Sequence, residues 1–190
     1  MPNIWIVDNR SRGDSLKASM TDRLITVLVA WYPDDTRVVR DVGDASRVRD
    51  GVVVLSGSSL SVVTDALPQP ATVAVARALR QRIPILGICF GFQMLAWLHG
   101  IPVRPLAQKV RQHRMVDSVG RVYFHHGDGV FPGASVDEQP ATCVHFDGAC
   151  VCGVQFHPEA TEAGRMWLWQ WIANPLGGHS KNKLKMTNTF

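Results

Sequence analysis

The sequence has no segment that approaches the ~18–20 uninterrupted apolar residues of a membrane-spanning helix. Its first residues, Met1-Pro-Asn-Ile-Trp-Ile-Val-Asp8, lack the basic-then-apolar layout of a secretion signal. It contains no internal repeat and no internal linker. Neither sign of charge is in large excess. The formal net charge is +4, and Lys181, Lys183 and Lys185 supply much of it. We therefore expect a cytoplasmic protein that binds neither a membrane nor nucleic acid.

The composition is that of one globular domain. A chain of 190 residues can bury a full core, and 46% hydrophobic content with 19% charge is ordinary globular usage. We expect a single domain over residues 1–176, followed by a basic and flexible tail over residues 177–190.

Apolar runs and helical spacings alternate along the first half of the chain, and they predict alternating strands and helices. The expected strands are 4–7, 36–40, 52–56 and 85–88, and the expected helices are 15–29, 71–82 and 90–99. Asp14 or Ser15 is a candidate cap for the first helix. From Val110 onward the pattern becomes β-rich, and it ends with a helix at about 162–172. This alternation predicts an α/β fold, a mostly parallel, helix-flanked open sheet with its site at the carboxyl ends of the strands and a β-rich C-terminal part.

A cysteine lies between two glycines in Gly87-Ile-Cys89-Phe-Gly91, where an expected strand meets an expected helix. Unpaired N–H groups and the helix dipole at such a bend favour the thiolate, the reactive form of cysteine. Gly87 and Gly91 remove side chains on either side, so the bend can be tight and a substrate can approach closely. A small core cysteine is the alternative, but packing alone does not need two glycines at symmetric spacing. We expect Cys89 to be a nucleophile.

A second cluster, Gly153-Val-Gln-Phe-His157-Pro-Glu159, supplies the partners that a thiol nucleophile needs. The thiol requires a base, and the base requires a third group that holds its ring. His157 and Glu159 are two residues apart, so their side chains share a face in an extended segment. Pro158 disfavours helix just before it. Alone, such a cluster is more often a turn, but together with Cys89 it predicts a Cys–His–Glu triad.

Residues 87–93 and 153–159 resemble the two signatures of class I glutamine amidotransferases. The signatures occur in the order typical of the family, and the likeness runs from Asn3 to about Asn174. The resemblance implies a flavodoxin-like fold. It also implies hydrolysis of the side-chain amide of glutamine through a cysteine thioester, with ammonia handed to a synthetase. In these enzymes the cysteine is the nucleophile, the histidine the base and the glutamate its orienting partner.

The oxyanion hole is where this sequence departs from the family. Attack by the thiolate creates a negative oxygen that needs preorganised N–H donors. One donor would be the backbone N–H of Phe90. The other comes, in the family, from a Gly-Gly-Pro or Pro-Gly-Pro-Gly loop, where this sequence has Gly57, Ser58 and Ser59. A serine forced to positive φ resists by about 1–2 kcal/mol, so we expect slow or partner-dependent glutaminase activity rather than an inactive site.

The resemblance also implies residues that bind glutamine. Gln93, one turn into the helix after the thiol, matches the substrate-binding glutamine of the family, and an exposed helix residue is the alternative. His126, Gly127 and Asp128 resemble part of the Ser-His-Gly-Asp-x-Val segment of the GMP synthetase branch, whose backbone holds the α-amino and carboxylate groups of glutamine. The adjacent histidines lack the carboxylate–histidine spacing of a catalytic metal site, so we expect no metal there.

The same comparison favours one branch of the family. The closing Gly-Val-Gln-Phe-His-Pro-Glu-Ala-Thr161 looks more like two-subunit GMP synthetase than like anthranilate or aminodeoxychorismate synthase, which usually has Ser where Ala160 stands. We expect glutamine as substrate, no cofactor in this chain, and a separate synthetase using ATP and Mg, since this length leaves no room for an acceptor-activating domain. Three alternatives stay open: an amidotransferase of another pathway, a stand-alone γ-glutamyl hydrolase and a catalytically silent binding subunit.

Cysteine and histidine also concentrate just before the second signature. Asp147-Gly148 predicts a two-residue hairpin turn, in which Cys143 faces Cys152. His145 then faces Cys150 on the same side of the ribbon. Three thiols and an imidazole could hold zinc, but flat hairpin faces are poor tetrahedral cages and structural sites usually use Cys-x-x-Cys knuckles. We interpret these residues as small buried side chains, assign no metal, leave zinc open, and expect no disulfide in a reducing cytoplasm.

Three tryptophans fall within the last expected helix. At helical spacing Trp167 and Trp171 share a face, whereas Trp169 points elsewhere. We expect the first two in the core and at least one tryptophan near the surface, where it would suit docking on a synthetase.

Overall fold

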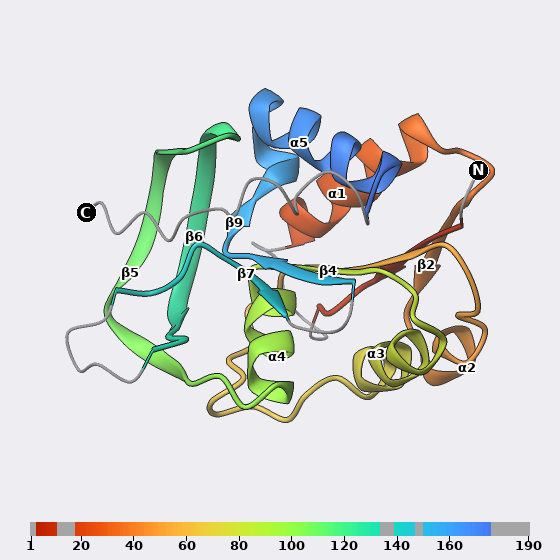
Figure 1. Ribbon diagram of the computed structural model, residues 1–190, viewed down its shortest axis with the longest axis horizontal. Helices are drawn as coiled ribbons and strands as arrows, with labels where there is room; N and C mark the ends of the chain where they lie inside the picture. Colours follow the sequence, from red (N-terminus) through yellow and green to blue (C-terminus); the bar gives the residue numbers. More distant parts are fainter. Residues whose placement is uncertain (1–2, 11–17, 134–138, 147–149, 176–190) are drawn as a thin grey trace.

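The computed structural model describes residues 3–10, 18–133, 139–146 and 150–175 (Figure 1). The expected tail, the cap of the first helix and the Asp147-Gly148 turn lie outside these residues. Among the residues described, none of the helices combines the length and the apolar character that crossing a membrane requires.

Six strands form the main sheet, in the order β2-β1-β3-β4-β8-β7 (Figure 1). Their bounds are β1 Ile4–Val7, β2 Thr36–Val39, β3 Val52–Leu55, β4 Ile85–Ile88, β7 Cys143–Phe146 and β8 Val151–Val154. Neighbouring strands are parallel except for the antiparallel pair β7–β8. Every residue of β1, β3, β4 and β8 is buried, as in a parallel sheet covered on both faces. The predicted fold class is confirmed.

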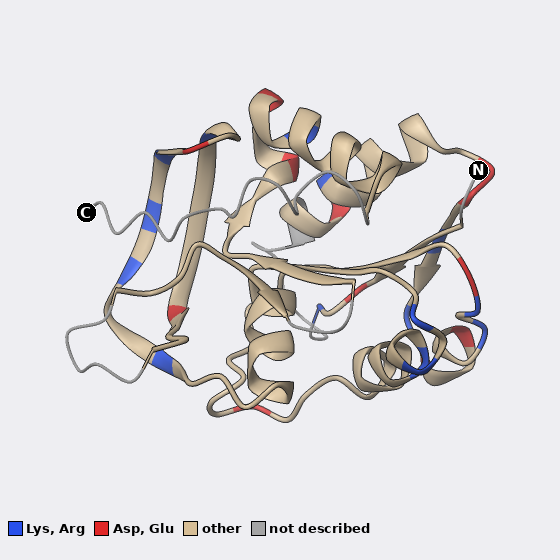
Figure 2. Ribbon diagram, in the orientation of Figure 1, with Lys and Arg blue, Asp and Glu red and all other residues tan. Residues whose placement is uncertain are grey.

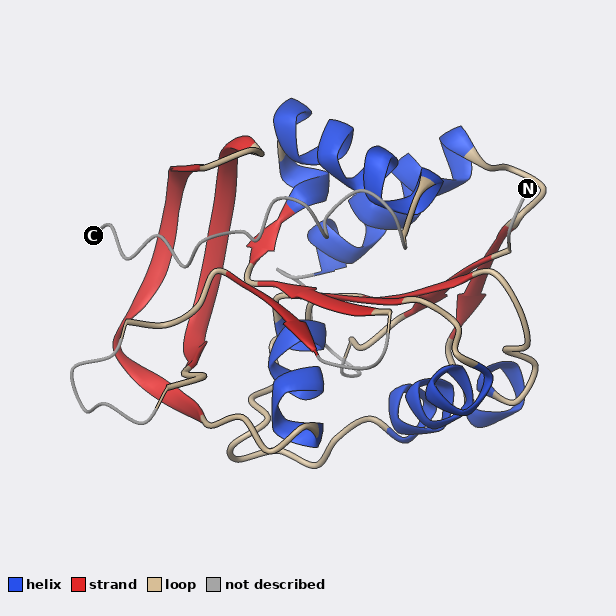
Figure 3. Cartoon of the chain, viewed as in Figure 1, coloured by secondary structure: helices blue, strands red, loops and turns tan. Residues whose placement is uncertain are grey.

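Helices cover both faces of this sheet (Figures 1 and 3). On one face lie α1 Ala18–Trp31 and α5 Glu162–Ala173, and on the other lie α2 Val42–Ala45, α3 Gln69–Gln81 and α4 Phe90–Leu98. Each face has its own apolar core, because alternate strand residues point to opposite sides. Trp167 and Trp171 are buried in one of these cores while Trp169 is exposed, as the helical spacing predicts.

A second, antiparallel sheet stands beside the first (Figure 3). It contains β5 Val103–Val116, β6 Gly120–Val130 and β9 Phe156–His157, in the order β5-β6-β9. The β-rich part therefore begins at Val103, seven residues before the predicted start. Gln155 alone separates β8 from β9, so the chain passes from the main sheet to the second sheet within one residue.

The β7–β8 hairpin does not have the register that a two-residue turn would give. Cys143 pairs with Val154 and His145 pairs with Cys152, which shifts the pairing by two residues. The last pair is Phe146 with Val151, so four positions rather than two separate the paired residues. An even shift leaves the side chains on their original faces. Cys143, His145 and Cys152 therefore still share one side.

Candidate active site

Cys89 lies at the sharp turn between β4 and α4, where the sequence predicts it. Its backbone has φ 53° and ψ −104°, in the left-handed half of the map that side chains rarely enter. The Cys89 N–H donates to the Val154 carbonyl at 2.8 Å, and the Cys89 carbonyl accepts from the Gln93 N–H at 3.0 Å. The fold thus holds one thiol in a strained conformation at the carboxyl end of the sheet.

Gly87 and Gly91 let α4 lie directly against the sheet. A Cβ on Gly87 would come within 2.6 Å of the Gly91 carbonyl oxygen, and a Cβ on Gly91 within 2.5 Å of the Leu55 carbonyl oxygen. Because the obstacles are backbone atoms, no side-chain rotation would relieve them. The predicted tightness of the bend is confirmed. The space beside these glycines is filled by the protein's own backbone, however, which corrects the expectation that it admits a substrate.

His157 and Glu159 reach this point from β9 and from the short 3-10 helix η1, Pro158–Ala160. Nδ1 of His157 lies 2.8 Å from Oε1 of Glu159, and both side chains are buried. Gly57 lies against both the ring and the thiol residue. A Cβ there would stand 3.0 Å from Cε1 of His157 and 3.7 Å from Cβ of Cys89. The fold therefore brings the three predicted catalytic residues to one place.

The electrostatic environment keeps a proton on His157. Burial alone would lower the pKa of its imidazole, but the negative charges of Glu159 and Cys89 more than offset burial and raise that pKa to about 10. At neutral pH the ring is an imidazolium beside the thiolate of Cys89 and the carboxylate of Glu159. A cation in this position can hold a thiolate by charge attraction and can give its proton to a leaving group.

The thiol opens onto a cavity of about 190 Å³ with a mostly polar wall. The loop after β3, the start of α4 and the second sheet build this wall. Among the residues that line it are Ser58, Cys89, Gln93, His126, Gly127 and Asp128, all predicted from the sequence. Segments that lie far apart in the chain thus meet around one cavity at the expected edge of the sheet.

Gln93 is buried rather than exposed, so the alternative of a solvent-facing helix residue is wrong. Its Nε2 donates to the Asp128 carbonyl at 2.9 Å. Nδ1 of His126 lies 2.8 Å from the same carbonyl, so Nδ1 carries the hydrogen. Burial, opposed by this hydrogen bond, lowers the pKa of His126 to about 4, and the ring is neutral at neutral pH. The Asp128 carbonyl is therefore engaged by the protein itself.

The loop after β3 does not carry the strain considered for serine. Positive φ among the described non-glycine residues occurs at Arg82, Cys89 and Ser118, but not at Ser58. The Ser58 hydroxyl accepts from the Leu60 N–H at 3.2 Å inside the loop. Serine at position 58 therefore does not impose the conformational penalty that would apply at positive φ.

Residues 6–166 match the family model described as Glutamine amidotransferase class-I. The chain belongs to this family. The amidotransferase chain is also similar to proteins named GMP synthase [glutamine-hydrolyzing]. It is 31% identical to that of Thermobifida fusca over 147 residues, covering 66% of this chain and 27% of the relative. It is 33% identical to that of Saccharomyces cerevisiae over 133 residues, covering 58% and 24%. The matched part thus spans about a quarter of the length of these relatives.

Solved structures share the fold of the amidotransferase chain. A protein from Thermoplasma acidophilum, described as a candidate subunit of GMP synthase, superposes with a TM-score of 0.66 at 21% identity and covers 90% of this chain and 92% of its own. A glutamine amidotransferase from Thermotoga maritima superposes with a TM-score of 0.56 at 16% identity and covers 89% and 81%. These likenesses show a common architecture of parallel sheet and flanking helices.

The structure adds residues to the amidotransferase site that the sequence did not single out. Gln155 is buried, and its Oε1 accepts from Gln93 Nε2 at 3.3 Å. The carbonyl of His125 lies 3.5 Å from the Cys89 thiol. Lys109 lines the cavity from β5, whose pairing with β6 is irregular between Pro105 and Val110. Gln155 lies within the second signature and could have been noticed there, whereas nothing in the sequence placed Lys109 near the thiol.

A stripe of basic residues follows β5 (Figure 2). The basic residues of this strand are Arg104, Lys109, Arg111 and Arg114. The stripe belongs to the second sheet, and it reaches the cavity at Lys109. An anionic group on a bound molecule would therefore find a cation at this wall.

Proposed function

We propose that this chain is a glutaminase subunit that hydrolyses the side-chain amide of glutamine through a thioester on Cys89 and passes the ammonia to a separate synthetase of the GMP synthetase type. The observation that carries the proposal is the convergence of the Cys89 thiol with the buried His157–Glu159 pair beside a polar cavity. The name GMP synthase borne by the relatives supports this choice of synthetase.

The first step is attack by the thiolate of Cys89 on the amide carbon of glutamine. A carbon–sulfur bond forms, and the carbonyl oxygen takes the negative charge. The backbone N–H groups of Phe90 and of the loop at Gly57 and Ser58 are the proposed donors to this oxygen. Losing one donor of this kind costs about 10²–10³-fold in rate, so the fixed loop conformation matters more than the identity of its side chains.

His157 completes the reaction. The imidazolium gives its proton to the leaving nitrogen, the carbon–nitrogen bond breaks, and ammonia departs from a glutamyl thioester. The neutral ring then takes a proton from water, which attacks the thioester and releases glutamate. Glu159 keeps Nδ1 engaged through its 2.8 Å contact, so the other ring nitrogen is the one that moves the proton.

The cavity wall would hold the amino-acid end of the substrate. We assign this role to Gln93 and to the backbone of His126, Gly127 and Asp128. Lys109 supplies a positive charge for the α-carboxylate. Because the carbonyl of Asp128 already accepts hydrogen bonds from within the protein, its role is to fix Gln93 and His126 in place.

The test compares glutamate release from L-glutamine by the wild-type chain and by Cys89→Ala, each alone and with the protein that co-purifies. Cys89→Ala should lose at least about 10³-fold, as nucleophile removal does in other hydrolases. Cys150→Ala, which removes a thiol outside the cavity, should retain activity. Diazo-oxo-norleucine should label Cys89 alone. Equal rates for wild type and Cys89→Ala would exclude the mechanism, and steady partner-free cleavage of γ-glutamyl peptides would identify a stand-alone hydrolase instead.

A further inference from the structure

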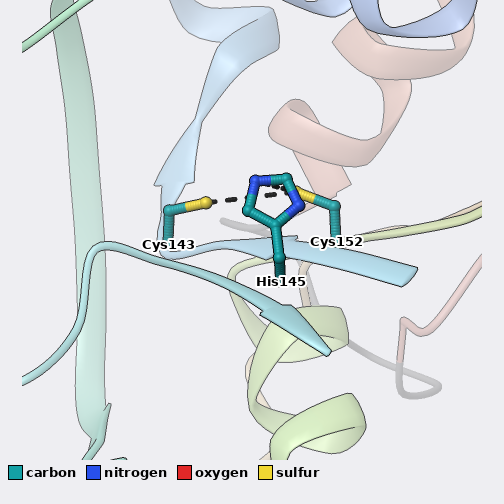
Figure 4. Close-up of side chains that lie close together, drawn as sticks. All are labelled: Cys143, His145 and Cys152. Atoms are coloured by element: carbon teal, nitrogen blue, oxygen red, sulfur yellow. Dashed lines mark hydrogen bonds between the residues drawn. The ribbon is translucent and has the colours of Figure 1, made fainter. Parts of the chain in front are cut away.

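A second group of reactive side chains, Cys143, His145 and Cys152, lies on the β7–β8 hairpin and takes no part in the glutaminase chemistry (Figure 4). The two sulfur atoms are 3.9 Å apart, and Sγ of Cys152 is 4.0 Å from Nε2 of His145. All three potential ligand atoms lie within 4.8 Å of one another. The group is on the α1–α5 side of the sheet, where both cysteines contact the apolar core.

These separations fit a metal ion in the middle of the group. Zinc–sulfur bonds of about 2.3 Å and zinc–nitrogen bonds of about 2.0–2.1 Å, arranged tetrahedrally, place two sulfurs about 3.8 Å apart and sulfur about 3.6 Å from nitrogen. The separations of 3.9 and 4.0 Å exceed these values by a few tenths of an ångström, and the third, between Cys143 and His145, is at most 4.8 Å. Rotation of the side chains, chiefly of exposed His145, would bring the three ligand atoms onto one face of a tetrahedron.

Neither core packing nor a disulfide accounts for the group as well as a metal does. His145 is exposed and is not a small residue, so filling of the core does not explain its place there. A disulfide is disfavoured, because Cys143 pairs with Val154 and stands diagonally from Cys152. Diagonal neighbours are about 7–8 Å apart along an antiparallel pair, whereas disulfides span Cα separations of about 4.4–6.8 Å. A metal ion bridges a longer gap than a sulfur–sulfur bond.

The donor set indicates which metal this group would bind. Two thiol sulfurs and one imidazole nitrogen are soft or borderline ligands, which favour zinc over calcium or magnesium. A hairpin face is too flat to surround the ion, so three protein ligands lie on one side of it. His145 is exposed to solvent, which can supply a water as a further ligand.

We propose that Cys143, His145 and Cys152 bind one Zn²⁺ ion, with water in the fourth coordination position. The site joins β7, at the edge of the main sheet, to β8. Through Gln155, β8 leads directly into β9 and His157. Zinc would thus stabilise the β7–β8 hairpin, in which the second signature begins. The proposal does not depend on the glutaminase assignment, because none of its three ligands lines the cavity.

Metal titration of the Cys89→Ser chain under reducing conditions tests this site, since that background removes the thiol of the cavity. Zn²⁺ is measured against a chromophoric chelator, and Co²⁺ reports thiolate ligation by its charge-transfer absorption. One ion should bind per chain. His145→Ala and Cys143→Ser should each weaken binding by at least about tenfold, as even loss of an outer-shell partner does, and should reduce the Co²⁺ absorption. Cys150→Ser is the matched control and should bind as its parent does.

Thermal unfolding provides a second measurement that does not depend on the buried cysteine. His145 is exposed, so His145→Ala should unfold at the temperature of its parent when no metal is present. Zn²⁺ should raise the unfolding temperature of the parent but not of His145→Ala. Sub-stoichiometric binding, or equal binding and equal stabilisation in the parent and both ligand variants, would overturn the proposal.

Discussion

Cys89 takes a backbone conformation that costs an L-residue about 1–2 kcal/mol. The turn can impose it because hydrogen bonds to Val154 and Gln93 hold the residue from both sides. Backbone strain concentrated at a thiol is a feature of nucleophile turns, where it exposes the reactive atom. Its presence here adds a physical reason for the assignment of Cys89 that the sequence could only suggest.

This strain predicts that glycine at residue 89 is more stable than alanine, the reverse of the usual order, in two variants that both lack the thiol. Glycine normally destabilises a structured position relative to alanine by about 0.5–1 kcal/mol. At residue 89 the left-handed conformation favours glycine, so Cys89→Gly should be more stable than Cys89→Ala by about 1 kcal/mol. Urea unfolding of both variants measures the difference. The opposite order would show that the turn relaxes when the thiol is removed.

Gly57 offers a direct test of the contact between loop and imidazole. A methyl group there would stand 3.0 Å from Cε1 of His157, so Gly57→Ala should displace the ring. Because displacements of about 1 Å can cost 10²-fold in rate, kcat/KM for glutamine should fall by about 10–100-fold. Cys150→Ala, which changes a residue outside the cavity, is the control. Similar losses in both variants would contradict a specific role for Gly57.

The two buried histidines, His157 and His126, make the stability of the fold depend on pH in opposite senses. The pKa of His157 is raised to about 10, so its contribution to stability is present below the unfolded value of 6.5 and is lost as pH rises through about 10. The pKa of His126 is lowered to about 4 in the folded chain. As pH falls, this imidazole therefore takes up its proton in the unfolded chain at a higher pH than in the folded chain. Burying neutral His126 therefore destabilises the fold progressively as pH falls from about 6.5 to 4, by up to about 3 kcal/mol.

Replacing His126 should weaken this acid sensitivity. The free energy of unfolding of His126→Asn should fall less between pH 6.5 and pH 4.5 than that of wild type, because the variant has no buried imidazole at that position to protonate on unfolding. Urea unfolding at the two pH values measures the change. His113→Asn removes an exposed histidine and should behave as wild type does; identical pH dependence in all three proteins would contradict the expectation.

At the scale of elements, the sequence predicts the first four strands of the main sheet, β1 to β4, within a residue. β1 and β4 have the predicted bounds because continuous apolar runs between turn residues have few other solutions. α2 was not predicted, since a four-residue helix has little periodicity, and only the side chain of Asp41, accepting from the Asp44 N–H, marks its start. The predicted β7–β8 register is wrong because the last pair, Phe146 with Val151, leaves four positions in the connection instead of two.

The packing of α4 on the sheet leads to a prediction for Gly87. A Cβ at this position would lie 2.6 Å from the carbonyl oxygen of Gly91, so Gly87→Ala must push the helix away from β4. Overpacking of this kind costs about 1–3 kcal/mol. Glutaminase activity should fall as well, because the turn that carries Cys89 joins β4 to the displaced helix. Leu98→Ala, at an exposed position of the same helix, should change stability by less than about 0.5 kcal/mol. Chemical unfolding of both variants checks the contrast.

At the scale of the whole molecule, the site exists only where two sheets meet. The main sheet contributes Cys89 and the loop at Gly57, while the second sheet contributes His126 and His157. A molecule bound in the cavity therefore contacts both sheets at once. Binding should therefore raise the free energy of unfolding of the whole fold rather than the stability of one element.

Glutamine should accordingly stabilise a chain that cannot consume it. In Cys89→Ser, L-glutamine at about 100 times its dissociation constant should add about 2.7 kcal/mol, which corresponds to a rise of about 5–10 °C in the unfolding temperature for a domain of this size. D-glutamine is the matched ligand with the α-groups inverted, and it should stabilise less. Differential scanning fluorimetry measures both, and equal shifts would contradict recognition of the amino-acid end by the cavity wall.

The sequence by itself determined the alternating architecture, the residues of the two signatures and the side of the hairpin on which Cys143, His145 and Cys152 lie. These follow from periodicity, from glycine spacing and from the two-residue repeat of a strand, all of which act over short range. Only the tertiary structure decided that Lys109 and Gln155 belong to the site, that Ser58 is unstrained, and which register β7 adopts. Those outcomes depend on how segments far apart in the chain pair and pack, because the pairing of strands and the meeting of two sheets are not fixed by local preference.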